Sequence, residues 1–147
     1  MKLSIIIPIR NEANVIAKSL DLISNNIKEI NYEVIAVNDF SEDNSYNIID
    51  EIKKENSRIK LFNNKIRGLG GAINLGIEKS TGEAICIMMA DMSDSIDDLK
   101  KYYNLIQSEN LSAVFGSRFI KGSNLSGYPM KKLILNRIFN YFTKFIF

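Results

Sequence analysis

Short runs rich in isoleucine and valine alternate along this chain with segments whose apolar residues recur at helical spacing. The apolar runs occupy residues 3–9, 32–37, 58–62, 84–89 and 112–116. The helical positions between them are Ile16, Leu20, Ile23 and Ile27, then Tyr46, Ile49 and Ile52, then Ile96, Leu99, Tyr103 and Ile106. Near-continuous apolar strands separated by amphipathic helices are typical of a mostly parallel sheet flanked by helices. We therefore predict an α/β, Rossmann-like fold, and 147 residues suffice for one such domain.

Polar residues that can start helices follow several of these runs. Ser41, with two acids directly after it, suits the capped first turn of the helix after the second strand, and Ser93 to Ser95 can cap the helix near Ile96. The stretch "RGLGGAINLG" at 67–76 opens the third helix. Each glycine inside a helix costs about 1 kcal/mol relative to alanine, so the run must lie before the helix or in its first turn.

The glycine run predicts free backbone N–H groups at a helix N-terminus, where an anion can bind. Gly70, within this run, is one of our candidate nucleotide-binding residues. A dinucleotide fingerprint is excluded by spacing, since Ile73 stands where a third glycine or alanine is needed and the run follows the third strand. No phosphate-loop lysine followed by serine or threonine occurs either, which argues against a nucleoside triphosphatase.

Acidic residues follow three of the predicted strands. Glu12 comes after the first, Asp39 ends the second, and Asp91 and Asp94 follow the fourth. The carboxyl edge of an open α/β sheet is where ligands bind, so the set favours a nucleotide-diphosphate pocket. The alternative for each acid alone is a structural role in a turn or in the first turn of a helix.

The amino-acid composition restricts the metal that such a pocket can hold. The chain has no histidine and one cysteine, Cys86, so the common zinc sites cannot be assembled. Carboxylates suit Mg²⁺ or Mn²⁺, and Asp91 and Asp94 are the candidate metal ligands, with substrate phosphates completing the shell. Cys86 lies within an apolar run, so we interpret it as a small buried hydrophobe, and the absence of a disulfide framework fits a reducing compartment.

Charge is distributed unevenly along the chain. Residues 111–147 contain six basic residues and no acid, whereas the whole chain has a net charge of only +2. The basic part favours an anionic partner, such as a phosphate group or a membrane surface. The alternative is a solvated basic face that closes on acids elsewhere in the fold.

Four stretches in this order, "SIIIPIRNEANVI", "VIAVNDFSEDNS", "RGLGGAINLGIEKSTGEAICIMMADMSD" and "VFGSRFIKGSNLSGYP", resemble glycosyltransferase family 2, most closely its dolichol-phosphate mannose synthase-like branch. The resemblance covers nearly the whole chain. It implies a GT-A nucleotide-diphospho-sugar transferase fold and inverting transfer of a sugar from a nucleotide donor such as GDP-mannose or a UDP-sugar, in cell-envelope glycan biosynthesis.

The resemblance also implies roles for individual residues. Pro8, Arg10, Glu12 and Asp39 would line the nucleoside pocket. Asp91 would act in catalysis by holding the Mg²⁺ or Mn²⁺ that bridges the donor diphosphate. Arg118 would be the second catalytic residue and would bind phosphate of the acceptor or the donor.

Two positions depart from the pattern of this family. Its usual Asp-Ala-Asp is here Met89-Ala90-Asp91, and its common double aspartate is Asn38-Asp39. Our hypothesis is that Asp94 replaces the missing carboxylate. Because the motif is altered, it stays open whether the protein depends on a metal ion.

The general bases that the chain can offer bear on whether the acceptor is an alcohol or a phosphate. An alcohol acceptor needs a general base, typically worth about 10²–10⁴-fold in rate, whereas a phosphate acceptor is already an anion. The chain has no histidine and residues 111–147 have no acid, so a polyprenyl or dolichyl phosphate fits. The alternatives are a family 2 transferase that acts on a saccharide hydroxyl, and a non-catalytic nucleotide-sugar-binding module.

The last residues, "MKKLILNRIFNYFTKFIF", combine apolar and basic residues. They are too few and too charged to span a bilayer but suit a helix lying on one. Alternatively, Ile134, Ile138, Phe142 and Phe145 pack against protein, including a second copy in a homo-oligomer. We therefore expect a GT-A domain at 1–120 and a basic acceptor-side segment at 121–147 that is incomplete at its C-terminus. We expect the protein at the cytoplasmic face of the membrane, with no nucleic-acid partner.

Overall fold

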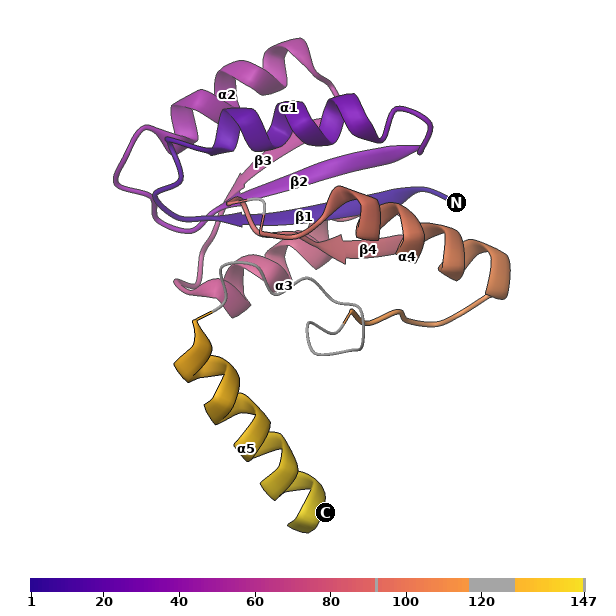
Figure 1. The fold of residues 1–147 in the computed structure, drawn as a ribbon. Coiled ribbons are helices and arrows are strands. Elements are labelled where there is room, and N and C mark those ends of the chain that lie inside the picture. The colour runs from indigo at the N-terminus through magenta and orange to yellow at the C-terminus, as the bar shows by residue number, and fades with distance from the viewer. Residues whose placement is uncertain (92, 117–128, 147) are drawn as a thin grey trace. The chain divides into compact units, whose positions relative to one another are not determined.

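The computed structural model describes residues 1–91, 93–116 and 129–146, which fall into two compact units, Met1–Val114 and Phe115–Phe147. The first unit holds four strands and four helices (Figure 1). Its elements in chain order are β1 (Leu3–Ile9), α1 (Ile16–Asn26), β2 (Tyr32–Asn38), α2 (Ser45–Glu55), β3 (Ile59–Asn63), α3 (Leu69–Lys79), β4 (Ala84–Ile87) and α4 (Ile96–Glu109). The second unit contains α5 (Met130–Ile146).

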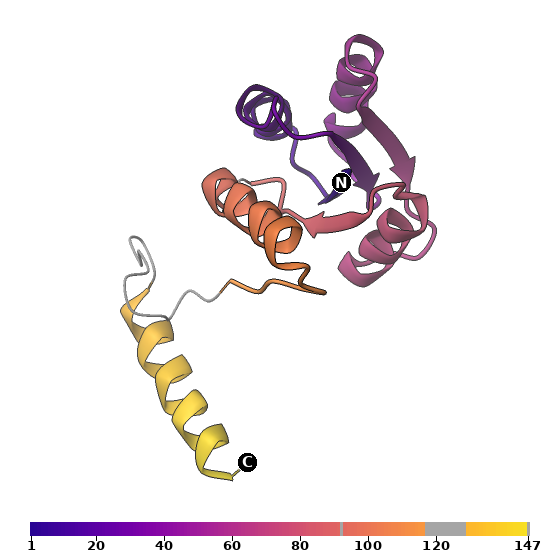
Figure 2. The same cartoon turned by 90° about the vertical axis from the view of Figure 1, so that its right-hand side faces the viewer.

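The four strands form one sheet in the order β3-β2-β1-β4, and all pairs are parallel. Leu3 of β1 lies opposite Tyr32 of β2 and Ala84 of β4, and Val34 of β2 lies opposite Ile59 of β3. Helices α1, α2 and α4 cover one face and α3 covers the other (Figure 2). The prediction of a parallel sheet flanked by helices is confirmed.

Alternate residues of the inner strands supply the two sides of the core. Ile5, Ile7 and Ile9 of β1 pack with α1, while Ile6 packs on the opposite face against α3. Helix α3 lies so close to the sheet that a Cβ at Gly76 would come within 2.3 Å of the Ile6 Cγ2 atom. Glycine is therefore required there by the close approach of the helix, because the Ile6 side chain is fully buried.

Strand β4 is shorter and less buried than predicted. It ends at Ile87 instead of Met89, and the side chains of Ile85 and Ile87 are 43% and 45% exposed. Its position at the edge of the four-stranded sheet explains the difference, because the apolar composition of a run does not specify whether both of its faces become covered.

The predicted fifth strand at residues 112–116 is wrong. These residues have irregular structure, and Phe115 is 91% exposed. A strand requires backbone hydrogen bonds to a neighbouring strand. In the described sheet, no strand pairs with residues 112–116. The short apolar run alone was therefore insufficient to define a strand.

Helix starts agree with the sequence in two cases and differ in one. Ser95 caps α4 by accepting a hydrogen bond from the Asp98 N–H at 3.3 Å, and the glycine run lies at the start of α3, as predicted. The proposed cap at Ser41 is wrong, since α2 begins at Ser45 after Asn44. Ser41 instead binds the preceding loop, where its Oγ accepts the Asn11 N–H at 3.2 Å.

Helix α5 confirms that the tail is helical. Its large apolar side chains include Ile138 (60% exposed), Phe139 (64%) and Phe142 (59%). Among the described residues, no helix is both long and apolar enough to cross a membrane.

Candidate functional site

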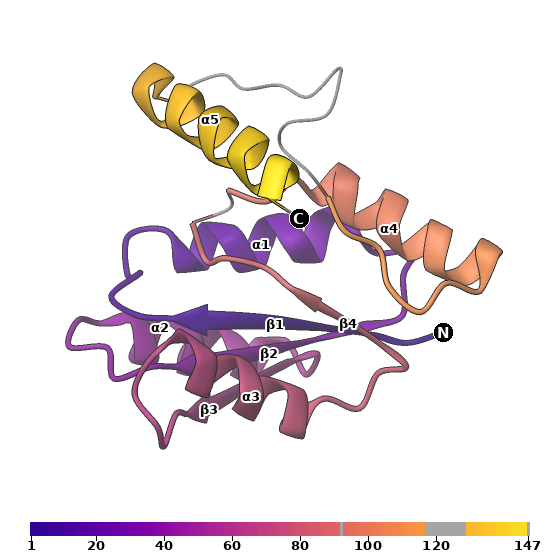
Figure 3. The ribbon, with the colours of Figure 1, turned by 90° about the horizontal axis from the view of Figure 1, so that it is seen from below.

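The carboxyl ends of the four parallel strands bring the loops after β1, β2, β3 and β4 to one edge of the sheet (Figure 3). Every candidate acid lies in one of these loops or at the end of its strand. The parallel topology therefore gathers residues that are far apart in sequence, as expected for a ligand site of an open α/β sheet.

Asp39 joins the loop after β2 to the start of α3. Its Oδ1 accepts hydrogen bonds from the Asn64 side-chain amide at 2.7 Å and from the Gly68 N–H at 2.9 Å, and its Oδ2 lies 3.1 Å from the same N–H. Asp39 is only 4% exposed. A buried carboxylate must be satisfied by such donors, so this cluster of Asp39, Asn64 and Gly68 fixes the turn into α3.

The same turn explains two of the glycines. Gly68 has a φ of 118°, a conformation that residues with a Cβ rarely adopt. A Cβ at Gly71 would lie 2.0 Å from the Ile66 carbonyl oxygen, which Asn64 binds through its side-chain amide at 2.6 Å. The glycine run therefore allows a tight turn whose backbone is anchored by Asn64.

The loops after β1 and β2 are held together by hydrogen bonds between side chains and backbone. Four backbone N–H groups donate to polar side chains of the loops or of the first residue of α2: Asn11 to Ser41 (3.2 Å), Glu12 to Ser45 (2.8 Å), Ala13 to Asp43 (2.9 Å) and Glu42 to Asn11 (2.8 Å). The hydrogen bond from Ser45 and those from nearby backbone lower the pKa of Asp43, so this anchor remains a carboxylate at neutral pH. These hydrogen bonds hold the two loops together at the carboxyl edge of the sheet.

Asp91 and Asp94 lie in the turn after β4. The Met89 N–H donates to Asp94 Oδ2 at 2.9 Å, and the Ser93 N–H donates to Asp91 Oδ1 at 2.9 Å. The turn is fastened to α1 as well, because Ser19 donates its hydroxyl to the Ala90 carbonyl oxygen at 2.6 Å. These contacts therefore hold Ala90, Asp91 and Asp94 to neighbouring parts of the protein.

Two carboxylates in one turn suit a hard divalent cation. The described residues contain no cluster of three or more histidine, cysteine, aspartate or glutamate side chains that could enclose a metal ion. Mg²⁺ commonly binds through one or two carboxylates, with substrate phosphates and water as the other ligands. Asp91 and Asp94 fit this open type of site, in which a diphosphate would supply the remaining oxygens.

Cys86 has no features of a reactive thiol. Its side chain packs partly against the core, and burial, together with the charge of Asp94, raises its pKa to about 11. The thiolate is the nucleophilic form, so the group is almost entirely unreactive at neutral pH. Its interpretation as a structural apolar residue agrees with this environment, although Cys86 is half-buried and not fully enclosed.

The remaining sequence candidates occupy different parts of the edge. Pro8 is buried in β1 opposite Val37, and Arg10 is exposed just after β1. Glu12 lies four residues before α1, whose first turn contains no acid, so its alternative role as a first-turn charge is wrong. Gly70 is the second residue of α3. Arg118 lies outside the described residues.

Sequence reasoning missed Asn64 and Asn11. Both follow strands, so the rule that ligand sites form at carboxyl ends could have identified them. Their partners, Asp39 and Glu42, lie 25 and 31 residues away, and periodicity does not pair such distant positions.

Two curated glycosyltransferases are similar in sequence to nearly the whole chain. It is 26% identical over 137 residues to a dolichol-phosphate mannosyltransferase of Pyrococcus furiosus, an alignment that covers 93% of this chain and 39% of that protein. It is 30% identical over 132 residues to a poly(ribitol-phosphate) beta-glucosyltransferase of Bacillus spizizenii, covering 88% of this chain and 20% of the relative. The chain thus spans well under half the length of these curated relatives.

Solved structures with the same fold include the mannosyltransferase PcManGT of Pyrobaculum calidifontis in complex with GDP-Man and Mn²⁺. Its TM-score is 0.59 at 26% identity, over 71% of this chain and 32% of that one. Residues 1–349 of S. aureus TarS give a TM-score of 0.64 at 22% identity, over 82% of this chain and 40% of that one. The parallel sheet and these neighbours confirm the GT-A fold. The family description "Glycosyl transferase family 2" matches residues 4–147, and the chain belongs to this family.

Proposed function

We propose that this chain forms the donor-binding part of an inverting glycosyltransferase that moves a hexose from a nucleotide-diphospho-sugar to a polyprenyl phosphate. The observation that carries the proposal is the ordered carboxyl edge. Asp39 holds the turn into α3 there, and the turn containing Asp91 and Asp94 is fastened to α1 through Ser19. Carboxylates that the protein holds in fixed positions in this way could bind a cation at the edge without first being reoriented.

The donor would bind across this edge. Pro8, Arg10, Glu12, Asp39 and Gly70 would surround the nucleoside and its phosphates. The bound GDP-Man and Mn²⁺ of the Pyrobaculum mannosyltransferase support a nucleotide-sugar and a divalent cation for this chain too. The neighbour TarS has been solved with UDP-GlcNAc, so both GDP and UDP donors remain candidates.

Asp91 and Asp94 would hold Mg²⁺ or Mn²⁺ against the donor diphosphate. The metal would supply Lewis-acid neutralisation of the diphosphate leaving group. Asp94 already accepts the Met89 N–H, so the protein orients this carboxylate within the turn. We infer that it replaces the acid that family members usually carry at the position of Met89.

A phosphate acceptor would remove the need for a general base in the acceptor-side part of the chain. The chain has no histidine, and residues 111–147 have no acid. An acceptor phosphate oxygen needs no deprotonation, so it would attack the anomeric carbon directly while the nucleotide diphosphate leaves from the opposite face. Arg118 would position the acceptor through its charge. The similarity to a dolichol-phosphate mannosyltransferase supports this acceptor class.

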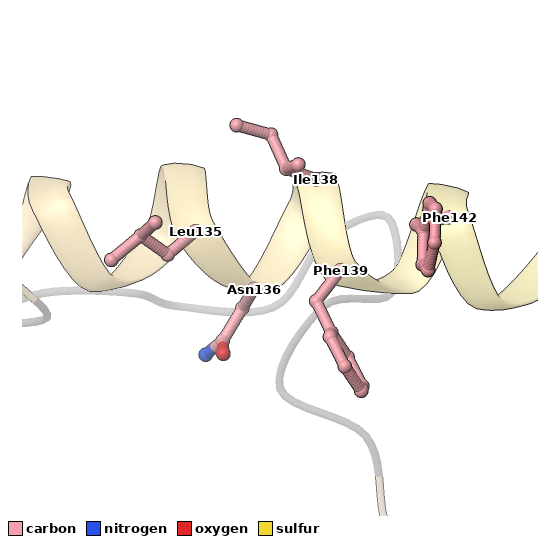
Figure 4. Close-up of a pocket in the computed structure, with 5 residues that line it drawn as sticks. All are labelled: Leu135, Asn136, Ile138, Phe139 and Phe142. Atoms are coloured by element: carbon pink, nitrogen blue, oxygen red, sulfur yellow. The ribbon is translucent and has the colours of Figure 1, made fainter.

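Helix α5 would place the protein at the cytoplasmic membrane surface. Leu135, Ile138, Phe139 and Phe142 surround a shallow depression on this helix (Figure 4). The helix also carries Lys131, Lys132, Arg137 and Lys144 and no acid. Apolar side chains combined with basic residues favour anionic lipid surfaces. We expect the protein to sediment with vesicles that contain anionic lipid and not with neutral vesicles.

A second candidate keeps the donor and changes the acceptor to a saccharide hydroxyl. The 30% identity to a poly(ribitol-phosphate) beta-glucosyltransferase favours it. A hydroxyl acceptor would require a general base, and the residues described at the carboxyl edge offer carboxylates for that role.

Product analysis distinguishes the two candidates. The protein is incubated with Mn²⁺ and radiolabelled GDP-mannose or UDP-glucose, together with a polyprenyl phosphate, the matching polyprenol or a polyol-phosphate polymer. We expect label only in the polyprenyl phosphate product, with loss of transfer in Asp91→Ala and Arg118→Ala and normal transfer in the surface control Glu83→Gln. Transfer to the polymer alone would establish the second candidate. Donor binding without transfer to any acceptor would indicate a non-catalytic module.

A further inference from the structure

Phe40 has an unusual backbone conformation at the carboxyl edge of the sheet. It directly follows Asp39 and has a φ of 56°, in the left-handed region. Bulky residues rarely adopt this conformation, and such outliers concentrate at binding and catalytic sites. Elsewhere in the described chain, the non-glycine residues with positive φ are Asn11 and Asn110, and asparagine tolerates this region far better.

The residues on both sides of Phe40 are fixed by hydrogen bonds. The Asp39 N–H donates to the Ile9 carbonyl oxygen at 2.7 Å, and the Asp39 carboxylate holds Gly68. On the other side, the Ser41 N–H donates to the Asn38 side-chain oxygen at 3.2 Å. These contacts impose the left-handed conformation on whichever residue stands between them, and glycine would adopt it without strain.

Packing does not explain why this residue is phenylalanine. Its side chain is 45% exposed, and it belongs to neither of the apolar clusters formed by the described residues. Backbone conformation therefore disfavours phenylalanine here, and its side chain is only partly buried. An aromatic ring kept at such a position is best explained by a ligand that contacts it.

We propose that the Phe40 ring is a stacking surface for the base of the nucleotide donor. The ring is attached to the loop that also carries Asp39, at the edge where the donor would bind, so this inference rests on the proposed function. A base offers a flat π-face, and stacking on an aromatic side chain is favourable for every base. The fastened loop would hold the ring in place before binding and so reduce the entropy lost when the complex forms.

A fluorescent substitution tests the contact directly. The chain contains no tryptophan, so Phe40→Trp introduces a single reporter. Titration with UDP and with GDP, each with Mn²⁺, should quench its emission with the dissociation constant that calorimetry gives. The matched control is Ile77→Trp, a 44% exposed position near the end of α3, where the helix has returned toward the amino edge of the sheet. We expect no quenching in this control.

A second variant separates ligand stacking from a structural role. Phe40→Gly should weaken nucleotide binding about tenfold or more, the range typical for loss of one base–aromatic stack. Its thermal midpoint should stay equal to or rise above that of the wild type, because glycine removes the strain at φ 56°. A merely structural role would instead lower the thermal midpoint together with the affinity.

The possible outcomes separate this inference from the proposed function. Normal nucleotide affinity in Phe40→Gly with no quenching in Phe40→Trp would overturn the stacking role and leave the donor site intact. Quenching by nucleotide-sugars but never by UDP or GDP would assign the ring to the sugar and overturn the inference as well. If the wild type binds neither nucleotide, the proposed donor site fails, and the stacking role fails with it.

Discussion

Replacing Glu33 by glutamine should destabilise the first unit, since it breaks a buried charged network. Glu33 lies in β2 with 2% of its surface exposed. Its Oε2 accepts hydrogen bonds from the Lys2 Nζ at 3.0 Å and the Lys60 Nζ at 2.8 Å. Its Oε1 accepts the Ser4 hydroxyl at 2.7 Å and the Thr81 N–H, also at 2.7 Å.

The size of the loss follows from these contacts. Glutamine keeps one oxygen but places an NH₂ group where the second carboxylate oxygen accepted hydrogen bonds, and it removes the charge from both ion pairs. Hydrogen bonds to charged groups contribute about 1.5–3 kcal/mol each, and removing one partner of a buried ion pair costs about 3–5 kcal/mol. The lysine side chains are 31% and 39% exposed and regain water, so we expect about 3 kcal/mol.

Urea denaturation at pH 7, followed by circular dichroism, measures this loss. The matched control is Glu83→Gln, because the Glu83 side chain is 71% exposed and lies 3.9 Å from the N-terminal amine. An exposed pair of this kind should contribute under about 1 kcal/mol. If Glu33→Gln lowered the free energy of unfolding no more than Glu83→Gln does, the reasoning from burial and hydrogen bonding would be refuted.

The same network predicts how stability depends on pH. Burial alone would raise the pKa of Glu33, but the hydrogen bonds from Lys60, Ser4, Thr81 and Lys2 outweigh it and hold the pKa well below its usual range. A depressed carboxyl pKa stabilises the fold above the unfolded value of about 4.3, and this contribution is lost as the pH falls toward the folded pKa. Wild-type stability should therefore decline below about pH 4, more steeply than that of Glu33→Gln. Equal slopes would contradict this assignment.

Two further predictions concern the core and the thiol. Gly76→Ala should lower the free energy of unfolding by about 1–3 kcal/mol because its Cβ would overlap the buried Ile6 side chain, whereas Gly70→Ala, with nothing within 4 Å of the new Cβ, should leave thermal stability equal or higher. Equal loss in the two variants would argue against close packing of α3 on the sheet. Alkylation of Cys86 by iodoacetamide should be slow at pH 8 and accelerate up to about pH 11, and Asp94→Asn should speed it by removing a nearby negative charge. Rapid alkylation of the wild type at pH 8 would contradict the raised pKa.

The local pattern of apolar residues correctly predicted the elements with a fully buried strand or helix face. Strand β1 is buried at every position, and α1 begins at Ile16, where the helical spacing of apolar residues begins. The segment 112–116 has the same apolar character but no neighbouring strand in the described sheet. Strand formation depends on that partner, which local composition does not reveal.

The candidate site was likewise predictable from the sequence only in part. Parallel topology alone predicted that Asp39, Asp91 and Asp94 lie at one edge of the sheet. The contact between Asp39 and Gly68 joins residues 29 positions apart and depends on the tertiary fold. Ser41 was wrongly predicted as a cap because a serine near a helix start can also satisfy a neighbouring loop, as it does with Asn11.

Calorimetric titration with UDP and GDP, each with and without Mn²⁺, tests the central claim that the carboxyl edge binds a nucleotide diphosphate through a metal. The wild type and Asp91→Asn are compared at the same pH and salt concentration. We predict that one nucleotide binds the wild type more tightly with Mn²⁺ than without it, and that Asp91→Asn loses this difference while keeping its thermal midpoint. Equal affinity with and without Mn²⁺, or an unchanged metal effect in Asp91→Asn, would contradict the account.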